Sequence, residues 1–179
     1  MFVRSAQLLG AWALGISVSQ LPAAMRAPMP AAHQALLAAA CRRRAAREPL
    51  QYILGEWDFC GLALAMQPPV LIPRPETEEL VGLVLARHGN APFRFLDIGS
   101  GSGALSVALL AAQPLASGVA VDVDPRAAAL TSHNAARLGV DSRLRVVTGA
   151  FETLPVPDTP FDVIVSNPPY LTTADLQHP

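Results

Sequence analysis

The chain has 179 residues, of which 51% are hydrophobic, so it is long enough for one domain with a small appendage and can bury a core. Its formal net charge of -1 gives no support for broad binding along a nucleic-acid backbone. The two cysteines, Cys41 and Cys60, have neither a CxxC spacing nor a histidine cluster nearby. This pattern predicts neither a zinc site nor a disulfide framework, and it favours a reducing compartment.

The first 47 residues contain six arginines and no acidic residue, and an apolar run from Ala6 to Val18 follows Arg4. A secretory signal needs a short basic start and an apolar stretch, whereas a mitochondrial presequence needs an arginine-rich, acid-poor helix. Both patterns are partly met. An ordinary helical domain without acids is an equally good interpretation, because Ser5–Gly15 also has helical spacing. A membrane span is disfavoured, since polar residues and glycines interrupt a run shorter than the roughly 20 residues required.

The N-terminal part predicts two or three helices. Residues 5–47 are rich in alanine and leucine at helical spacing and are interrupted by prolines, so we expect a small helical domain over 1–47. Between 48 and 75, three short apolar pieces separated by glycines predict a hairpin that links two domains. These pieces are Gln51–Leu54, Trp57–Phe59 and Leu62–Met66.

From residue 76 the pattern becomes alternating. Acids in the first turn and Gly89 beyond the last predict a helix over Glu76–Arg87. Strands separated by helices then predict βαβ crossovers and a parallel sheet. The expected strands are Phe93–Ile98, Ser117–Val121, Leu144–Thr148 and Phe161–Ser166, with helices over Gly103–Ala112 and Pro125–Leu138.

A glycine-rich turn follows the first of these strands. In the sequence from Asp97 to Gly103, three alternating glycines allow the backbone to approach a ligand and expose the amides of a helix N-terminus. A dinucleotide-binding fold or a purely steric turn would use a similar run. The acid-then-GxGxG spacing favours S-adenosylmethionine, because Asp97 stands where it could meet the positively charged amino group.

A second acid, Asp122, ends the next strand about 20 residues after the glycines, where a carboxylate accepts hydrogen bonds from two ribose hydroxyls. This indicates an adenosine ligand. Asp124 directly precedes Pro125, and this pair is typical of the capped start of a helix. The predicted role of Asp124 is therefore structural.

The fourth strand runs into Ser-Asn-Pro-Pro-Tyr, residues 166–170. A proline-rich strand exit is the simplest alternative. An amide nitrogen, however, is a poor nucleophile that must be held in line with a methyl donor. The side-chain oxygen of Asn167 and the carbonyl of Pro168 offer two acceptors for the two N–H groups of such an amide. Tyr170 supplies an aromatic wall for a cationic sulfonium or the substrate.

This tetrapeptide, Asn167–Tyr170, resembles the motif of methyltransferases that act on planar amino or amide nitrogens in DNA, ribosomal RNA and glutamine. Two longer stretches, Arg47–Phe59 and Ile72–Leu80, resemble the linker hairpin and pre-domain loop of the HemK-type release factor glutamine methyltransferases. Relatives that act on ribosomal proteins differ after the corresponding proline and arginine, so Pro75–Glu78 favours a release factor as substrate. A helix cap at Thr77 is the alternative interpretation.

The resemblance implies an α/β fold: a Rossmann-like S-adenosylmethionine-dependent methyltransferase sheet over 76–179, incomplete with strands 1 to 4 only. A helical domain that contacts the release factor and a β-hairpin linker would precede it. It also implies a monomer with no bound metal, no DNA partner and no membrane association. The cofactor contacts it implies are Asp97, Gly99, Ser100, Gly101, Ser102, Gly103, Asp122, Phe151 and Asn167. The implied catalytic residues are Asn167, Pro168 and Tyr170. The implied substrate contacts are Asn167, Pro168, Pro169, Tyr170, Arg74 and Glu76.

The chain departs from the family in two ways. Relatives have Gly-Asp-Trp where this chain has Gly149–Phe151, so an acid for the adenine amino group is missing while an aromatic ring remains to stack. The chain also stops nine residues after Tyr170, where the family architecture continues through three more strands. A strand order of 3-2-1-4 would leave the fourth strand as an open edge with Val163 and Val165 exposed. We therefore expect a truncated isoform or fragment.

The sequence is compatible with three functions. The first is methylation of the glutamine in the Gly-Gly-Gln tip of a release factor. The second is a nucleic-acid amino methyltransferase with the same motif, which the near-neutral charge disfavours. The third is a non-catalytic fragment that binds a partner. The linker resembles the animal organelle branch of the family, which favours the mitochondrion, with the cytoplasm as the alternative.

Overall fold

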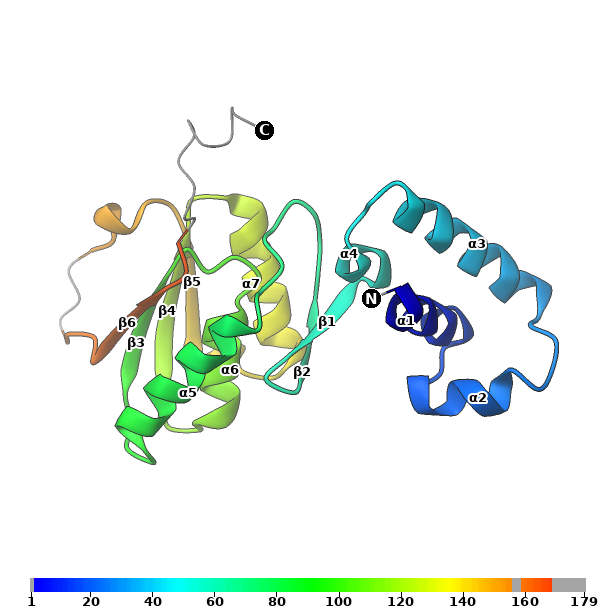
Figure 1. Ribbon diagram of the computed structural model, residues 1–179. Helices are drawn as coiled ribbons and strands as arrows, with labels where there is room; N and C mark the ends of the chain where they lie inside the picture. Colours follow the sequence, from blue (N-terminus) through cyan, green and yellow to red (C-terminus); the bar gives the residue numbers. More distant parts are fainter. Residues whose placement is uncertain (1, 156–158, 169–179) are drawn as a thin grey trace. The chain divides into compact units, whose positions relative to one another are not determined.

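The computed structural model describes residues 2–155 and 159–168 (Figure 1). The chain divides into two compact units, Met1–Glu56 and Trp57–Pro179. Residues 48–75, expected as a linker, are therefore shared between the units. Across the described ranges, no helix has the length and apolar character needed to cross a membrane.

The first unit is helical. Its elements are α1 (Phe2–Leu14), the 3-10 helix η1 (Val18–Gln20), α2 (Leu21–Ala24), α3 (Ala31–Ala45) and α4 (Leu50–Leu54). The expectation of two or three helices up to residue 47 is confirmed, and α1 packs against α3. The interpretation of Gln51–Leu54 as part of a hairpin is wrong. Pro49 caps the start of this segment and Gly55, at φ 77°, ends it, so the apolar residues form a short helix.

The hairpin consists of β1 (Glu56–Phe59) and β2 (Leu62–Ala65). Cys60 and Gly61 connect the strands with φ values of 53° and 75°, the left-handed pair that a two-residue hairpin turn requires. Phe59 and Leu64 are buried in the second unit. The hairpin thus begins at Glu56, five residues after Gln51, where the apolar pattern placed its start.

The second unit contains a four-stranded parallel sheet with the strand order β5-β4-β3-β6. This confirms the expected α/β class and the order 3-2-1-4. The strands are β3 (Arg94–Ile98), β4 (Ser117–Asp122), β5 (Leu144–Thr148) and β6 (Val163–Ser166). The helices are α5 (Glu76–His88), α6 (Ala104–Ala112) and α7 (Pro125–Arg137), with the 3-10 helices η2 (Asp141–Arg143) and η3 (Phe151–Thr153).

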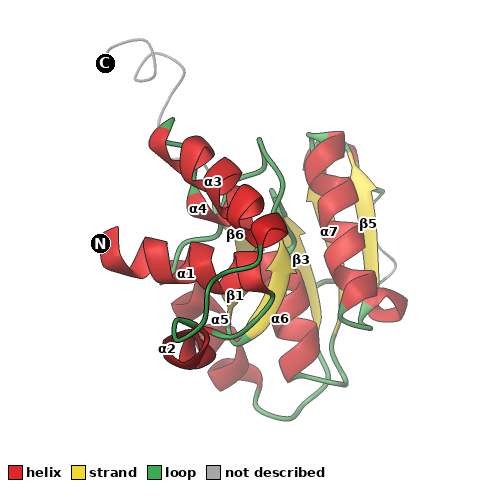
Figure 2. Ribbon diagram, turned by 90° about the vertical axis from the view of Figure 1, so that its right-hand side faces the viewer, coloured by secondary structure: helices red, strands yellow, loops and turns green. Residues whose placement is uncertain are grey.

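Three helices cover one face of the sheet. Figure 1 shows α5, α6 and α7 on one side of the strands, and Figure 2 shows the same layering of red helices over yellow strands. Phe95 and Ala120 lie on this covered face and are fully buried. Val165 pairs in register with Asp97 on the same face and is only 3% exposed. The expectation that Val165 would be exposed is therefore wrong, because strand alternation turns Ile164, 61% exposed, to the open face instead.

Candidate active site

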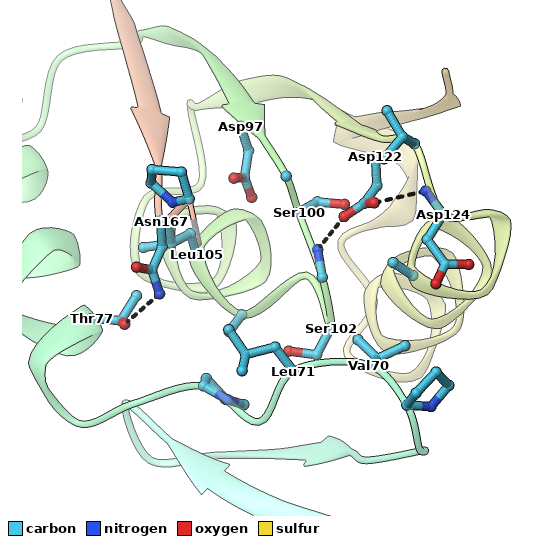
Figure 3. A pocket seen from close by; sticks show the side chains of 18 residues that line it. Val70, Leu71, Thr77, Asp97, Ser100, Ser102, Leu105, Asp122, Asp124 and Asn167 are labelled. Carbon is cyan, nitrogen blue, oxygen red and sulfur yellow. Dashed lines mark hydrogen bonds between the residues drawn. The ribbon is translucent and has the colours of Figure 1, made fainter. Parts of the chain in front are cut away.

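The carboxyl ends of β3, β4 and β6 surround a cavity of about 420 Å³ (Figure 3). Parallel strands end at one edge of their sheet, and ligands of open α/β folds bind in the crevice there. Residues 99–102 after β3 and 122–124 after β4 form two of its walls. Residues 69–71 and 73 from the loop before α5 form a third, and Asn167 and Pro168 after β6 complete it.

The glycine turn places backbone atoms at the cavity. Gly99, Gly101 and Gly103 have φ values of 76°, 58° and 80°, which side-chain-bearing residues rarely adopt. No described atom lies within 4 Å of a Cβ built on Gly99 or Gly101, so at these positions the missing side chain leaves space for a ligand. Gly103 differs, because its Cβ would lie 3.0 Å from Thr131 Cγ2. Gly103 does not line the cavity; it allows α6 to approach α7.

Two buried polar residues of α7 hold this turn. The Thr131 hydroxyl donates to the Gly101 carbonyl (3.1 Å) and shares a 3.0 Å hydrogen bond with Ser100 Oγ. Asn134 Nδ2 donates to the Ser102 carbonyl (2.9 Å) and to the Ala65 carbonyl (3.1 Å), while its Oδ1 accepts from the Ala65 amide (2.8 Å). Asn134 therefore connects the glycine turn to the β2 strand.

Thr131 and Asn134 were not predicted as site residues. The available signal was two polar residues three positions apart on the otherwise apolar face of the 125–137 helix. Buried polar groups of this kind need partners, which here are the backbone groups of the turn.

Asp97 is 1% exposed and points toward the cavity (Figure 3). Its Oδ2 accepts a hydrogen bond from Ser106 Oγ at 2.6 Å, whereas no donor in the described chain reaches its Oδ1. Burial raises the pKa of Asp97 to about 6, against the opposing effect of the Ser106 hydrogen bond. A buried carboxylate oxygen without a partner is suited to a positively charged ligand group, which would supply the missing donor.

Asp122 is half-buried beside the turn. Its Oδ2 accepts from the Gly101 amide and its Oδ1 from the Asp124 amide, both at 2.9 Å. Because a carboxylate has about four acceptor sites, both oxygens retain capacity for further donors. Asp124 accepts from the Arg126 amide and caps α7, so its expected structural role is confirmed.

Asn167 follows β6, and its Nδ2 donates to the Thr77 hydroxyl at 3.2 Å (Figure 3). Pro168 lies at the same end of the cavity. Pro169 and Tyr170 lie outside the described residues. The interpretation of Thr77 as a helix cap is wrong: α5 begins after Pro75, no side-chain cap bond is made among the described residues there, and Thr77 lies inside the helix. Thr77 was not predicted as a site residue.

A second cavity of about 360 Å³ adjoins Asn167. It is lined by Arg74, Glu76, Thr77, Leu80, Ser166 and Asn167. The two substrate candidates Arg74 and Glu76 therefore share a cavity with Asn167, and Thr77 and Asn167 line both cavities. Phe151 lines neither; it lies in η3 with 47% of its surface exposed. Within the described ranges, no group of three or more histidine, cysteine, aspartate or glutamate side chains is placed to hold a metal.

The strand order, the glycine turn after the first strand and the acid after the second define a Rossmann-like methyltransferase fold. A family model described as "Methyltransferase small domain" matches residues 82–178, and the chain belongs to this family. A second model, "PrmC N-terminal domain", matches residues 3–55.

Three relatives illustrate the similarity. The release factor glutamine methyltransferase of Geobacter sulfurreducens is 51% identical over 144 residues, covering 78% of this chain and 49% of its own. The human "MTRF1L release factor glutamine methyltransferase" is 46% identical over 148 residues, which cover 75% of this chain and 44% of the human protein. The release factor glutamine methyltransferase of Bordetella pertussis is 42% identical over 172 residues, which cover 95% of this chain and 63% of that relative. The chain thus spans about half the length of the curated relatives it matches most strongly.

Proposed function

We propose that the protein transfers a methyl group from S-adenosylmethionine to the side-chain amide of the glutamine in the Gly-Gly-Gln motif of a peptide-chain release factor. The observation that carries the proposal is the position of Asn167. It lies at the boundary between a cavity with acids suited to the cofactor and a second cavity lined by Arg74 and Glu76. The relatives named above, which are release factor glutamine methyltransferases, support the choice of substrate.

The first cavity fits the cofactor by its donor and acceptor groups. The partnerless Oδ1 of Asp97 would accept from the ammonium of the methionine part. The backbone of Gly99 to Ser102 would lie along that part, and the spare acceptor capacity of Asp122 would take the ribose hydroxyls. We also propose that the Phe151 ring stacks on the adenine.

The second cavity would receive the glutamine. When bound, S-adenosylmethionine supplies a methyl group on a positively charged sulfur: the N–C bond forms as the C–S bond breaks, the bond electrons remain on sulfur, and the amide nitrogen releases one proton to solvent. Asn167 Oδ1 and the Pro168 carbonyl would accept from the two amide hydrogens and hold the nitrogen in line. Pro169 and Tyr170 would complete this wall, and Arg74 and Glu76 would contact the residues beside the glutamine.

Partner and location follow from the same resemblance. We infer that residues 1–47 contribute to binding the release factor, that residues 48–75 link them to a catalytic part over 76–179, and that the protein acts as a monomer. The likeness of the linker to the animal organelle branch supports the mitochondrion. The cytoplasm is the alternative, because several of the relatives are bacterial.

The test is methyl transfer from labelled S-adenosylmethionine to a purified release factor by this chain. Asn167→Ala, and a substrate whose Gly-Gly-Gln glutamine is replaced, should each abolish the transfer. A folded chain that binds the release factor without transfer would favour the non-catalytic alternative. Transfer to nucleic acid instead of the release factor would favour an amino methyltransferase of that class.

A further inference from the structure

Thr77 and Asn167 come from distant parts of the sequence and meet at the boundary of the two cavities. Asn167 follows β6 and Thr77 lies in the first turn of α5, and the Nδ2–Oγ1 hydrogen bond of 3.2 Å joins them. Thr77 is buried at 8% exposure. Because both residues line both cavities, a methyl group that passes from one cavity to the other passes beside this pair.

In the structure, the nitrogen end of the Asn167 amide is the end that meets the Thr77 hydroxyl. A primary amide has an acceptor oxygen and a donor nitrogen, and rotation by 180° about its last bond exchanges them. A donor nitrogen turned toward a substrate amide would oppose the substrate N–H groups rather than bind them. Because Nδ2 is directed at the Thr77 hydroxyl, the acceptor oxygen is on the other side of the group.

Thr77 is well suited to act as a fixed acceptor. Its β-branched side chain has two main rotamers in a helix, and burial at 8% exposure restricts its movement further. Its amide donates to the Arg74 carbonyl at 3.0 Å, and Pro75 precedes the helix, which fixes the backbone of this turn. A capping role does not account for the threonine, because the cap position is Pro75.

We infer that Thr77 is a positioning residue that orients the Asn167 amide so that its oxygen accepts from the substrate nitrogen. The inference rests on the proposed function, since it assigns Thr77 a role in the same transfer. Thr77 acts through Asn167 and needs no contact with the reacting atoms.

The test compares Thr77→Val, which keeps the shape and removes the acceptor, with Thr77→Ser, which keeps the acceptor. Thr159→Val is the matched control, because Thr159 is exposed and lies near Arg94, at the opposite ends of the strands. We expect Thr77→Val to lower kcat at least about tenfold, which corresponds to about 1.4 kcal/mol. The KM for S-adenosylmethionine should change less than about twofold, and Thr77→Ser and Thr159→Val should stay near the wild type. Thr77→Ala replaces Thr77→Val if circular dichroism shows that the valine variant is unfolded.

A second readout does not depend on transfer. The side-chain amide signal of Asn167 in a ¹⁵N correlation spectrum, assigned by its loss in Asn167→Asp, should shift in Thr77→Val and return in Thr77→Ser. An unchanged signal, or a kcat equal to that of Thr159→Val, would overturn the inference. A loss of cofactor affinity as large as the loss of kcat would also overturn it. Absence of transfer by the wild type would instead count against the proposed function, and the amide signal would still test the hydrogen bond.

Discussion

Ser106 Oγ lies 2.6 Å from Asp97 Oδ2, while the other oxygen of the same buried carboxylate has no partner in the described chain. One oxygen is thus fixed by α6, and the other remains for a ligand at the cavity. Because burial raises the pKa of Asp97 to about 6, this carboxyl group changes from protonated to ionised within an accessible pH range.

Cofactor binding should therefore strengthen as the pH rises. A ligand ammonium favours the ionised carboxylate, and at a pKa of about 6 the ionised fraction rises from about a tenth at pH 5 to about nine tenths at pH 7. We expect the affinity for S-adenosylhomocysteine to increase about tenfold over this range, as measured by titration calorimetry. Asp97→Asn should bind more weakly at pH 7 and lose this dependence. A wild-type affinity that is flat from pH 5 to 7 would exclude Asp97 as the ammonium acceptor.

The same shift makes a prediction for stability without ligand. The folded pKa of Asp97 is raised from 3.8 to about 6, so the folded chain binds more protons than the unfolded chain between these values. Its contribution is fully present below pH 3.8 and is lost as the pH rises through 6. Relative to Asp97→Asn, the wild type should lose about 2 to 3 kcal/mol of unfolding free energy between pH 4 and pH 7 in urea titrations. A difference that is constant with pH would contradict the shift.

Gly118 should tolerate no side chain. A Cβ built there would lie 2.3 Å from Phe95 Cζ, and the Phe95 ring is fully buried. Gly118→Ala should lower the unfolding free energy by about 1 to 3 kcal/mol, because the ring must move within a packed core. Gly82→Ala is the matched control, since Gly82 is exposed in α5 and no described atom lies within 4 Å of its Cβ position. That control should be neutral or stabilising by up to about 1 kcal/mol; equal effects of the two changes on urea midpoints would contradict the packing argument.

Local patterns predicted the parts of this fold that local rules determine. The strands, the parallel sheet and the cap at Asp124 follow from periodicity, crossover rules and residue chemistry, whereas the strand order was implied by the family resemblance. Helix α4 was missed because four apolar residues between a proline and a glycine fit a strand as well as a helical turn. The roles of Thr77 and Asn134 could not be predicted, because each depends on a partner more than 60 residues away.

Asn134 joins three backbone groups that would otherwise be buried without partners. It is fully buried, and its amide bonds both backbone groups of Ala65 and the carbonyl of Ser102. Asn134→Ala should lower the unfolding free energy by about 2 to 4 kcal/mol, since each unsatisfied buried group costs about 1 to 3 kcal/mol and part of the loss is relieved by rearrangement.

The same change should weaken S-adenosylhomocysteine binding, because the Ser102 carbonyl belongs to the turn that lines the cavity. His133→Ala is the matched control on α7, as His133 is exposed, and it should change neither urea unfolding nor binding measurably. If Asn134→Ala destabilised the chain but bound the ligand with wild-type affinity at a temperature where it is folded, the turn would keep its shape without this residue. Thr131 would then be sufficient to hold the turn through its hydrogen bonds to Ser100 and Gly101.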